Sequence, residues 1–309
     1  MSAAQYTFTF KAMGSRCELS MYARSSTEAE RIFELAQKEV QRFEHKYSRY
    51  RTDSVTSQIN AHAGSGKALA VDSETAQLLN YAHALFEQSE GLFDVTSGVL
   101  RKAWNFNSGV CPSDADLAPL LPLIGWSKVE WDGAQVGLPR PGMEIDLGGF
   151  VKEYAADVVA MLCRSEGVEH GFANLGGDIR IIGPHPDGSP WRVGIQHPRE
   201  DHTAIIRVDV HRGAIATSGD YERFMLVDGQ RYSHLLDPRT GRSLALNFSS
   251  VSVIADLCVL AGSFSTIAML KSVSEPHWLH DSDLAYVIID QQMKLSGSLL
   301  TGQTTSSQA

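Results

Sequence analysis

Cysteine is scarce in this chain, and long hydrophobic runs are missing altogether. The four cysteines, Cys17, Cys111, Cys163 and Cys258, lie far apart and form no Cys-x-x-Cys pair. This spacing excludes a disulfide scaffold and a cysteine zinc site, and buried reduced thiols are the expectation. No stretch of 18 consecutive apolar residues occurs, so the sequence predicts no membrane insertion.

The signals of export and of nucleic-acid binding are also missing. The first residues, MSAAQYTFTFKAMGS, contain no basic segment followed by an apolar core, and no lipoprotein box is visible. Acidic residues outnumber basic ones by 36 to 27, for a formal net charge of −9, and Lys and Arg form no run. We therefore expect a cytoplasmic protein with no nucleic-acid partner. An anionic ligand would need local cations or helix N-termini, because the net charge repels it.

Helical and strand patterns occupy separate blocks of the 309 residues. Three helices are predicted first: one that opens at Thr27 with a Thr27–Glu30 capping box, one over 73–89, and one that follows Gly149. From Gly171 onward short strands dominate, interrupted by one helix over about 256–271. The predicted strands are 6–10, 16–22, 172–175, 178–182, 191–196, 205–210, 214–217, 250–255, 285–290 and 293–296.

This order favours an α+β fold with mixed or antiparallel sheets and flanking helices over a doubly wound sheet. We expect one domain over residues 1–300, either undivided or built from two fused subdomains, and a disordered polar tail over 301–309.

The stretch RYSHLLDPRTG predicts a strand over 232–236 that ends at a β-turn. Asp237 caps the turn, the proline after it presets the backbone, and the glycine absorbs the exit conformation. A preceding strand over 223–227 would form a hairpin with it. His234 is then expected near the strand end with Leu236 facing the same way. The residues alone leave two alternatives open for this histidine: a hydrogen bond to the turn, or a place in a site.

The stretch IDLGGFVKEYAAD reads as a strand, a Gly-Gly turn and the start of a helix. Lys152 adds a positive charge to the first helical turn, where free N–H groups can bind an anion. Simple packing of the helix on a sheet explains the same pattern equally well. The sequence is neither a Walker loop nor a Rossmann fingerprint.

Eight motifs appear in a characteristic order over about Met13 to Leu270. They read KAMGSRCEL, YSRYRTDSVTSQIN, GLFDVTSGVL, IDLGGFVKEYAAD, NLGGDI, AIATSGDYERF, SHLLDPRTG and SVSVIADLCVLAGSFSTIAML. In this order the chain resembles the ApbE family of FAD:protein FMN transferases, many of which are exported lipoproteins. The resemblance implies an ApbE-like architecture related to the T-fold. It also implies FAD as substrate, Mg²⁺ for cleavage of the pyrophosphate, and transfer of FMN to a Thr or Ser hydroxyl of an acceptor protein with release of AMP.

The resemblance also assigns candidate site residues. Those implied to contact FAD are Met13 and Tyr50 at the flavin, Leu92, Phe93 and Asp94 on the adenine side, and Asp146, Lys152 and Leu236. Those implied to hold the metal are Gly149, through its carbonyl, Ser265 and Thr266. His234 is the implied base for the acceptor hydroxyl, and an imidazole of ordinary pKa, ~6.5, is largely neutral at physiological pH.

Two positions of the metal motif depart from the family pattern. Gly262 stands where the family has the aspartate of Ala-Asp-Ala-x-x-Thr, which predicts weakened or altered Mg²⁺ binding. Glu153 replaces the glycine that usually follows the lysine, within reach to lend its own carboxylate. Three functions therefore stay open: FMN transfer, which we favour, FAD binding without transfer as a carrier or regulator, and hydrolysis of FAD to FMN and AMP. The chain contains no Asp-Gly-x-Ser/Thr-Gly-Ala-Thr acceptor signature.

Overall fold

The computed structural model describes residues 3–301, which form two compact units built from alternating parts of the chain. Unit 1 contains the described residues up to Arg42, Lys152–Tyr221 and the described residues from Leu246 onward. Unit 2 contains Phe43–Val151 and Glu222–Ala245. The chain therefore leaves unit 1 twice. The predicted tail over 301–309 lies outside the described residues apart from Thr301.

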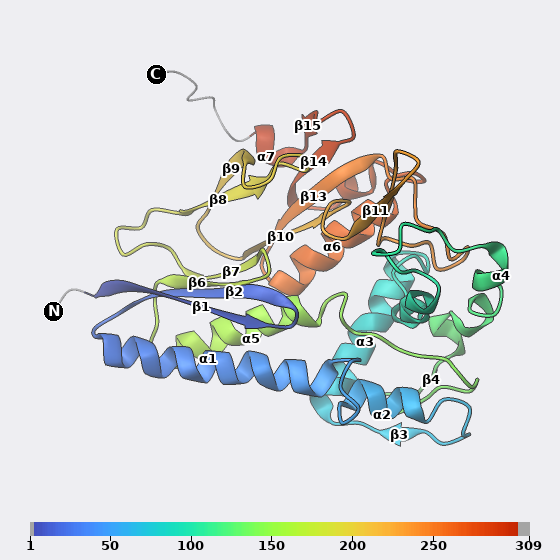
Figure 1. Ribbon diagram of the computed structural model, residues 1–309. Helices are drawn as coiled ribbons and strands as arrows, with labels where there is room; N and C mark the ends of the chain where they lie inside the picture. The colour runs from blue at the N-terminus through green and yellow to red at the C-terminus, as the bar shows by residue number, and fades with distance from the viewer. Residues whose placement is uncertain (1–2, 302–309) are drawn as a thin grey trace. The chain divides into compact units, whose positions relative to one another are not determined.

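Unit 1 is built on an eight-stranded sheet in which every paired neighbour is antiparallel. The strand order is β1-β2-β6-β7-β10-β13-β14-β15 (Figure 1). Its strands are β1 (Ala4–Ala12), β2 (Ser15–Ala23), β6 (Gly171–Leu175), β7 (Asp178–Gly183), β10 (Ala214–Gly219), β13 (Phe248–Ala255), β14 (Ala285–Asp290) and β15 (Leu295–Ser296). A separate hairpin pairs β8 (Trp191–Gln196) with β9 (Ala204–Val210). The predicted α+β class with antiparallel sheets is confirmed.

The sheet of unit 1 is covered on both faces, because successive side chains of a strand point to opposite sides. On β10, Ile215 packs into a cluster with Trp191 and Val208 of the β8–β9 hairpin. The next residue, Ala216, packs instead with Ala261 of the helix α6 (Cys258–Leu270). Small residues at this contact let the helix approach the strands closely.

The other helices that lie wholly or mostly in unit 1 are amphipathic or short. The helix α1 (Ser26–Tyr47) runs along the β1–β2 hairpin in Figure 1, and its Phe33 stacks on Phe8 with ring centroids 4.6 Å apart. The remaining elements are α5 (Val151–Ser165), the short 3-10 helix η4 (Trp278–Asp281) and α7 (Ser298–Thr301). The predicted Thr27–Glu30 capping box is wrong. Ser25 Oγ accepts from Glu28 N at 3.2 Å instead, so the cap lies two residues earlier.

The carboxylate of Asp157 joins three elements of unit 1. It lies on α5, is only 4% exposed, and accepts from the first backbone N–H groups of α6, at 2.8 Å from Cys258 and 2.9 Å from Val259. The N-cap residue of α6, Leu257, offers no side-chain acceptor, so Asp157 takes that role from another helix. Arg180 of β7 completes the contact with an ion pair, Nε to Oδ1 at 2.9 Å.

Unit 2 consists of short elements apart from the 16-residue helix α3 (Ser73–Gln88). Its helical elements are α2 (Val55–Ala61), α3 (Ser73–Gln88), η1 (Val95–Lys102), α4 (Asp114–Leu117), η2 (Leu121–Leu123) and η3 (Trp126–Lys128). Its strands are β3 (Leu69–Ala70), β4 (Glu130–Trp131) and β5 (Gln135–Gly137) in one sheet and the hairpin β11 (Phe224–Val227) and β12 (Gln230–Ser233). Met225 packs with Leu100 and Trp104, and Trp104 Nε1 donates to Gly241 O at 2.7 Å. These contacts attach residues 222–245 to the rest of the unit.

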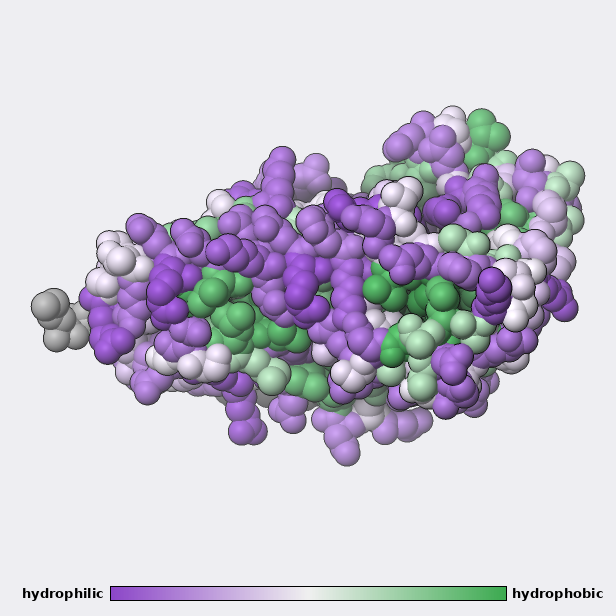
Figure 2. Space-filling view, turned by 90° about the horizontal axis from the view of Figure 1, so that it is seen from below, coloured by the Kyte–Doolittle hydropathy of each residue, from purple (hydrophilic) through white to green (hydrophobic). Residues whose placement is uncertain are grey.

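The surface is mostly hydrophilic on the face that Figure 2 shows, with smaller hydrophobic areas. Within residues 3–301 no helix combines the length and the apolar character that a membrane crossing requires. All four cysteines are free; Cys111 is half-buried and the other three are buried.

Candidate active site

Both units carry candidate site residues. In unit 1 these are Met13, Lys152, Ser265 and Thr266. In unit 2 these are Tyr50, Leu92, Phe93, Asp94, Asp146, Gly149, His234 and Leu236.

The central group of unit 1 is one amine between two carboxylates. Lys152, in the first turn of α5, forms an ion pair with Asp178 of β7, and its Nζ lies 3.5 Å from Glu153 Oε1. Lys152 Nζ also donates to Leu175 O at 3.2 Å, and Asp178 Oδ1 accepts from Thr217 N at 3.3 Å. The amine that was predicted to contact FAD is therefore held by Asp178, Leu175 and Glu153.

Burial and mutual charge shift the titration of this group. Burial raises the pKa of Glu153 to about 7; the Lys152 charge opposes this rise and the Asp178 charge adds to it. Burial by itself would lower the pKa of Lys152, but the carboxylates of Glu153 and Asp178 outweigh it, and that pKa is raised. Two acids thus compete for a single lysine, and a further cation near them would be stabilised.

Hydroxyl groups from two elements lie beside one another in the same unit. Ser218 Oγ of β10 is 2.8 Å from both Ser265 Oγ and Thr266 Oγ1 of α6, and Ser265 Oγ donates to Gly262 O at 2.9 Å. The structure therefore brings the predicted metal residues Ser265 and Thr266 together with a third hydroxyl. Oxygen donors of this kind suit a hard cation such as Mg²⁺.

Met13 lies in the two-residue turn of the β1–β2 hairpin, between the paired residues Ala12 and Ser15. Its φ is 51° and that of Gly14 is 72°, the backbone of a type I′ turn. Glycine and asparagine adopt this conformation readily, whereas methionine is strained in it by about 1–2 kcal/mol. A strained residue that persists at a hairpin tip is consistent with the predicted contact to a ligand.

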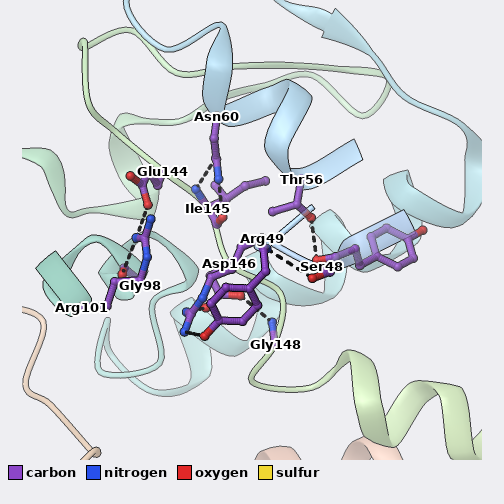
Figure 3. Close-up of polar contacts among 12 residues, drawn as sticks. Ser48, Arg49, Thr56, Asn60, Gly98, Arg101, Glu144, Ile145, Asp146 and Gly148 are labelled. Carbon is purple, nitrogen blue, oxygen red and sulfur yellow. Dashed lines mark hydrogen bonds and ion pairs between the residues drawn. The ribbon is translucent and has the colours of Figure 1, made fainter. Parts of the chain in front are cut away.

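In unit 2 Asp146 is held by an ion pair with Arg49 (Figure 3). Gly148 N donates to Asp146 Oδ1 at 3.0 Å, and the side-chain amide of Asn60 exchanges two hydrogen bonds with the backbone of Ile145. A Cβ on Gly98 would lie 2.8 Å from Asp146 Cβ, so only glycine fits there without a shift. These contacts fix the position of the Asp146 carboxylate.

The ring of Tyr50 is 77% exposed. The Arg49 guanidinium lies 4.9 Å from the ring centroid and donates from Nη2 to the Tyr50 hydroxyl at 2.8 Å. An aromatic face that is open to solvent and oriented by an arginine is suited to stacking on a planar ring such as a flavin.

Asp94 acts within its own loop. It caps η1, and its oxygens accept from Thr96 N at 2.8 Å, Thr96 Oγ1 at 2.6 Å and Trp126 N at 3.0 Å. Burial raises the pKa of Asp94, while these hydrogen bonds lower it by a smaller amount. Leu92 and Phe93 beside it are buried, and the Phe93 ring lies 3.1 Å from the position that a Cβ on Gly149 would take.

His234 lies just beyond a strand rather than within it. The predicted hairpin of two strands is present as β11 and β12, but the predicted end of the second strand at Leu236 is wrong, because β12 ends at Ser233. Leu236 forms an isolated bridge with Ser243 and packs at the edge of the Trp104 cluster. The predicted turn at Asp237 is present, with Asp237 Oδ1 accepting from Arg239 N at 2.8 Å.

The imidazole of His234 has a defined orientation. Its Nδ1 lies 3.1 Å from the carbonyl oxygen of Arg223, which also accepts from His234 N at 3.0 Å. A carbonyl oxygen only accepts, so we assign the ring proton to Nδ1, which leaves the Nε2 lone pair free. Burial lowers the pKa of His234; the hydrogen bond to the Arg223 carbonyl opposes this shift by a smaller amount, and the Arg223 charge adds to it.

The sequence model of the ApbE family matches residues 13–288. The chain belongs to the ApbE family. An FAD:protein FMN transferase of Vibrio cholerae is 35% identical over 229 residues, which cover 72% of this chain and 68% of that protein. One from Klebsiella pneumoniae is 33% identical over 255 residues, or 81% and 77% of the two chains. The crystal structure of the ApbE protein from Thermotoga maritima matches with a TM-score of 0.87 at 31% identity and covers 96% of this chain and 98% of that one.

Membership of the ApbE family confirms the resemblance predicted from the eight motifs. Three further polar residues of the two clusters were missed at that point: Arg49, Asp178 and Ser218. Arg49 and Ser218 lie inside quoted motifs, at YSRY and ATSGD, so their signal was present and unused. Asp178 lies inside a quoted motif as well, at NLGGDI, but its pairing with Lys152 was not anticipated.

Proposed function

We propose that this chain is an FAD:protein FMN transferase, which transfers FMN from FAD to a Thr or Ser hydroxyl of an acceptor protein and releases AMP. The observation that carries this proposal is the match of residues 13–288 to the ApbE family, with relatives above 30% identity that are named FAD:protein FMN transferase. The orientation of His234 and the charged group around Lys152 support it independently.

The reaction needs a base for a weak nucleophile. The acceptor hydroxyl oxygen forms a bond to the phosphorus of the FMN half, and the bond from that phosphorus to the bridging oxygen breaks. AMP leaves with the bridging oxygen, and the hydroxyl proton goes to the base. His234 suits this role, because its Nδ1 is engaged with the Arg223 carbonyl and its Nε2 is available to accept the proton.

The substrate contacts are proposed as they were predicted. Met13 and Tyr50 are proposed to contact the flavin. Leu92, Phe93, Asp94, Asp146 and Leu236 are proposed as further FAD contacts. Lys152 would bind a diphosphate oxygen through the N–H bonds that it now directs at carboxylates, and a helix N-terminus favours the same charge.

Magnesium dependence is part of the proposal, and the donors of unit 1 fit that ion. Ser265 and Thr266 supply hydroxyl oxygens, Glu153 and Asp178 supply carboxylates, and the predicted carbonyl of Gly149 stays a prediction. Mg²⁺ usually takes one or two carboxylates together with substrate phosphates. When bound, it would neutralise charge on the oxygens of the breaking diphosphate.

The test is a product assay with purified protein, FAD, Mg²⁺ and a synthetic peptide that carries an Asp-Gly-x-Thr-Gly-Ala-Thr sequence. We expect AMP in equal amount to a yellow peptide whose mass has increased by the FMN adduct. A control peptide with both threonines changed to alanine should give neither product. AMP with an unmodified peptide would indicate FAD hydrolysis instead, and bound FAD with neither product would indicate a carrier.

A further inference from the structure

The side chain of Glu153 occupies the space that a side chain at position 262 would need. A Cβ on Gly262 would lie 2.7 Å from Glu153 Cγ and 3.2 Å from both Glu153 Cδ and Oε1. Glu153 lies in the first turn of α5 and Gly262 lies in α6, so this contact joins two helices of unit 1. The two departures from the family pattern are therefore not independent: the residue gained on α5 fills the place left by the residue lost on α6.

Glu153 is buried with one oxygen unused. The residue is 9% exposed, and its Oε2 has no hydrogen-bond partner among the described residues. An unpaired carboxylate oxygen in such a position is costly, because burial removes the water that would otherwise solvate it. An ordinary structural glutamate would be paired at both oxygens or exposed. This arrangement instead leaves an acceptor ready for a ligand.

The surroundings of Glu153 favour a cation. Lys152 is shared between Glu153 and Asp178, so the three groups carry one positive and two negative charges when all are ionised. Ser265, one turn along α6, donates to the carbonyl of Gly262, beside the Glu153 side chain. No three His, Cys, Asp or Glu side chains group around a metal position within residues 3–301, so hydroxyl or phosphate oxygens must complete any ligand set.

We propose that the Glu153 carboxylate holds the divalent cation in this chain and takes the place of a carboxylate at position 262. This inference rests on the proposed function, which includes dependence on such a cation. It also predicts that position 262 must stay small as long as Glu153 is present. An aspartate introduced there by itself would collide with Glu153, and neither carboxylate could then take its position at the cation.

The experiment measures Mn²⁺ binding by electron paramagnetic resonance, with FAD present at a saturating concentration and an FAD-only blank. The variants are Glu153→Gln, Glu153→Gly, Gly262→Asp and the double exchange Glu153→Gly/Gly262→Asp. Glu153→Gln keeps the shape and removes the charge, so we expect Mn²⁺ affinity to fall by about tenfold or more. Each other single variant should also bind weakly, and the double exchange should recover most of the lost affinity. Glu166→Gln is the control, because Glu166 pairs with Arg31 at the surface.

The outcomes separate this inference from the function on which it rests. Unchanged Mn²⁺ affinity in folded Glu153→Gln, in a protein whose FMN transfer needs a divalent cation, would overturn the assignment of Glu153 alone. A wild-type protein that binds no Mn²⁺ and transfers FMN in EDTA would overturn the metal dependence and this inference together. Loss of Mn²⁺ binding in Glu153→Gln would support the inference even in a protein that transferred no FMN.

Discussion

Substitution of Asp157 by asparagine should destabilise the protein far more than the small change in the side chain suggests. Asparagine keeps one acceptor for the N-terminus of α6, but its NH₂ group would face the second backbone N–H, and Arg180 would lose its charged partner. Breaking a buried ion pair by removing one partner costs about 3–5 kcal/mol. This free energy already includes the loss of the charge-assisted hydrogen bond from the backbone N–H group.

The expected shift in melting temperature follows from the chain length. At about 2.1 cal/mol/K per residue, unfolding of all 309 residues in a single transition has an entropy of ~0.65 kcal/mol/K. A loss of 3–5 kcal/mol then lowers Tm by about 5–8 °C. Because α6 also carries Ser265 and Thr266, Mn²⁺ affinity should fall in the same variant.

The assay is thermal unfolding followed by circular dichroism, with Asp209→Asn as the matched control. Asp209 makes the same kind of ion pair, with Arg192 Nε at 3.1 Å, but both side chains are exposed. A pair of that kind contributes about 0–1 kcal/mol, so the control should lie within about 2 °C of wild type. Equal Tm values for the two variants would refute the role assigned to Asp157.

Two further predictions concern the site residues. Because the pKa of His234 is lowered and its neutral form accepts the proton, the acid limb of kcat/KM should lie below pH ~6.5 and vanish with the activity in His234→Ala; a limb above that pH would contradict the assignment. The neutral histidine also binds fewer protons than the unfolded chain in that range, so stability should fall as the pH is lowered. Met13→Asn should raise the free energy of unfolding by up to about 1 kcal/mol, since asparagine tolerates the positive φ of this turn, and should weaken FAD binding measured by fluorescence quenching. Stronger FAD binding without added stability would contradict both the strain assigned to Met13 and its proposed contact with FAD.

The long helices and the strands of unit 1 were predictable from the sequence because their signals are local. The helix over 73–89 appears as α3, capped by Asp72 Oδ1, which accepts from Thr75 N at 2.9 Å. The helix that was placed at Thr27 shows the limit of this reasoning. Ser25, Ser26 and Thr27 can all cap a helix, and the contact of Arg24 N with Glu28 Oε2 at 2.8 Å favours the first of them. The periodicity of apolar residues cannot indicate which of these three residues caps the helix.

The strand around His234 was predicted too long for a comparable reason. Leu235 and Leu236 continue an apolar pattern, but tertiary bonds redirect the backbone: Ser243 Oγ donates to Ser233 O at 2.8 Å, and Asp237 N donates to Arg242 O at 2.8 Å. The sequence identified the turn correctly because Asp-Pro and Gly have their own conformational preferences.

The parts of the site that could not be predicted all depend on contacts between distant residues. Arg49 and Asp146 are separated by 97 positions, and the fit of Glu153 against Gly262 joins residues that are farther apart still. From the sequence, Gly262 indicates only that a metal-binding carboxylate is absent. In the structure the absence of a side chain at Gly262 leaves room for the Glu153 side chain, so the two substitutions have to be interpreted together.

The alternation of the two units along the chain has a consequence for biosynthesis. β10 ends at Gly219 and its partner β13 begins at Phe248, and residues 222–245 of the other unit are made between them. At ~5–20 residues per second, a ribosome takes a few seconds to add this segment, and the open edge of β10 has no β13 to pair with in that time. A slow codon stretch in this interval would prolong exposure of a nascent strand, so the interval is where a trigger factor or a similar holdase would give most protection against aggregation.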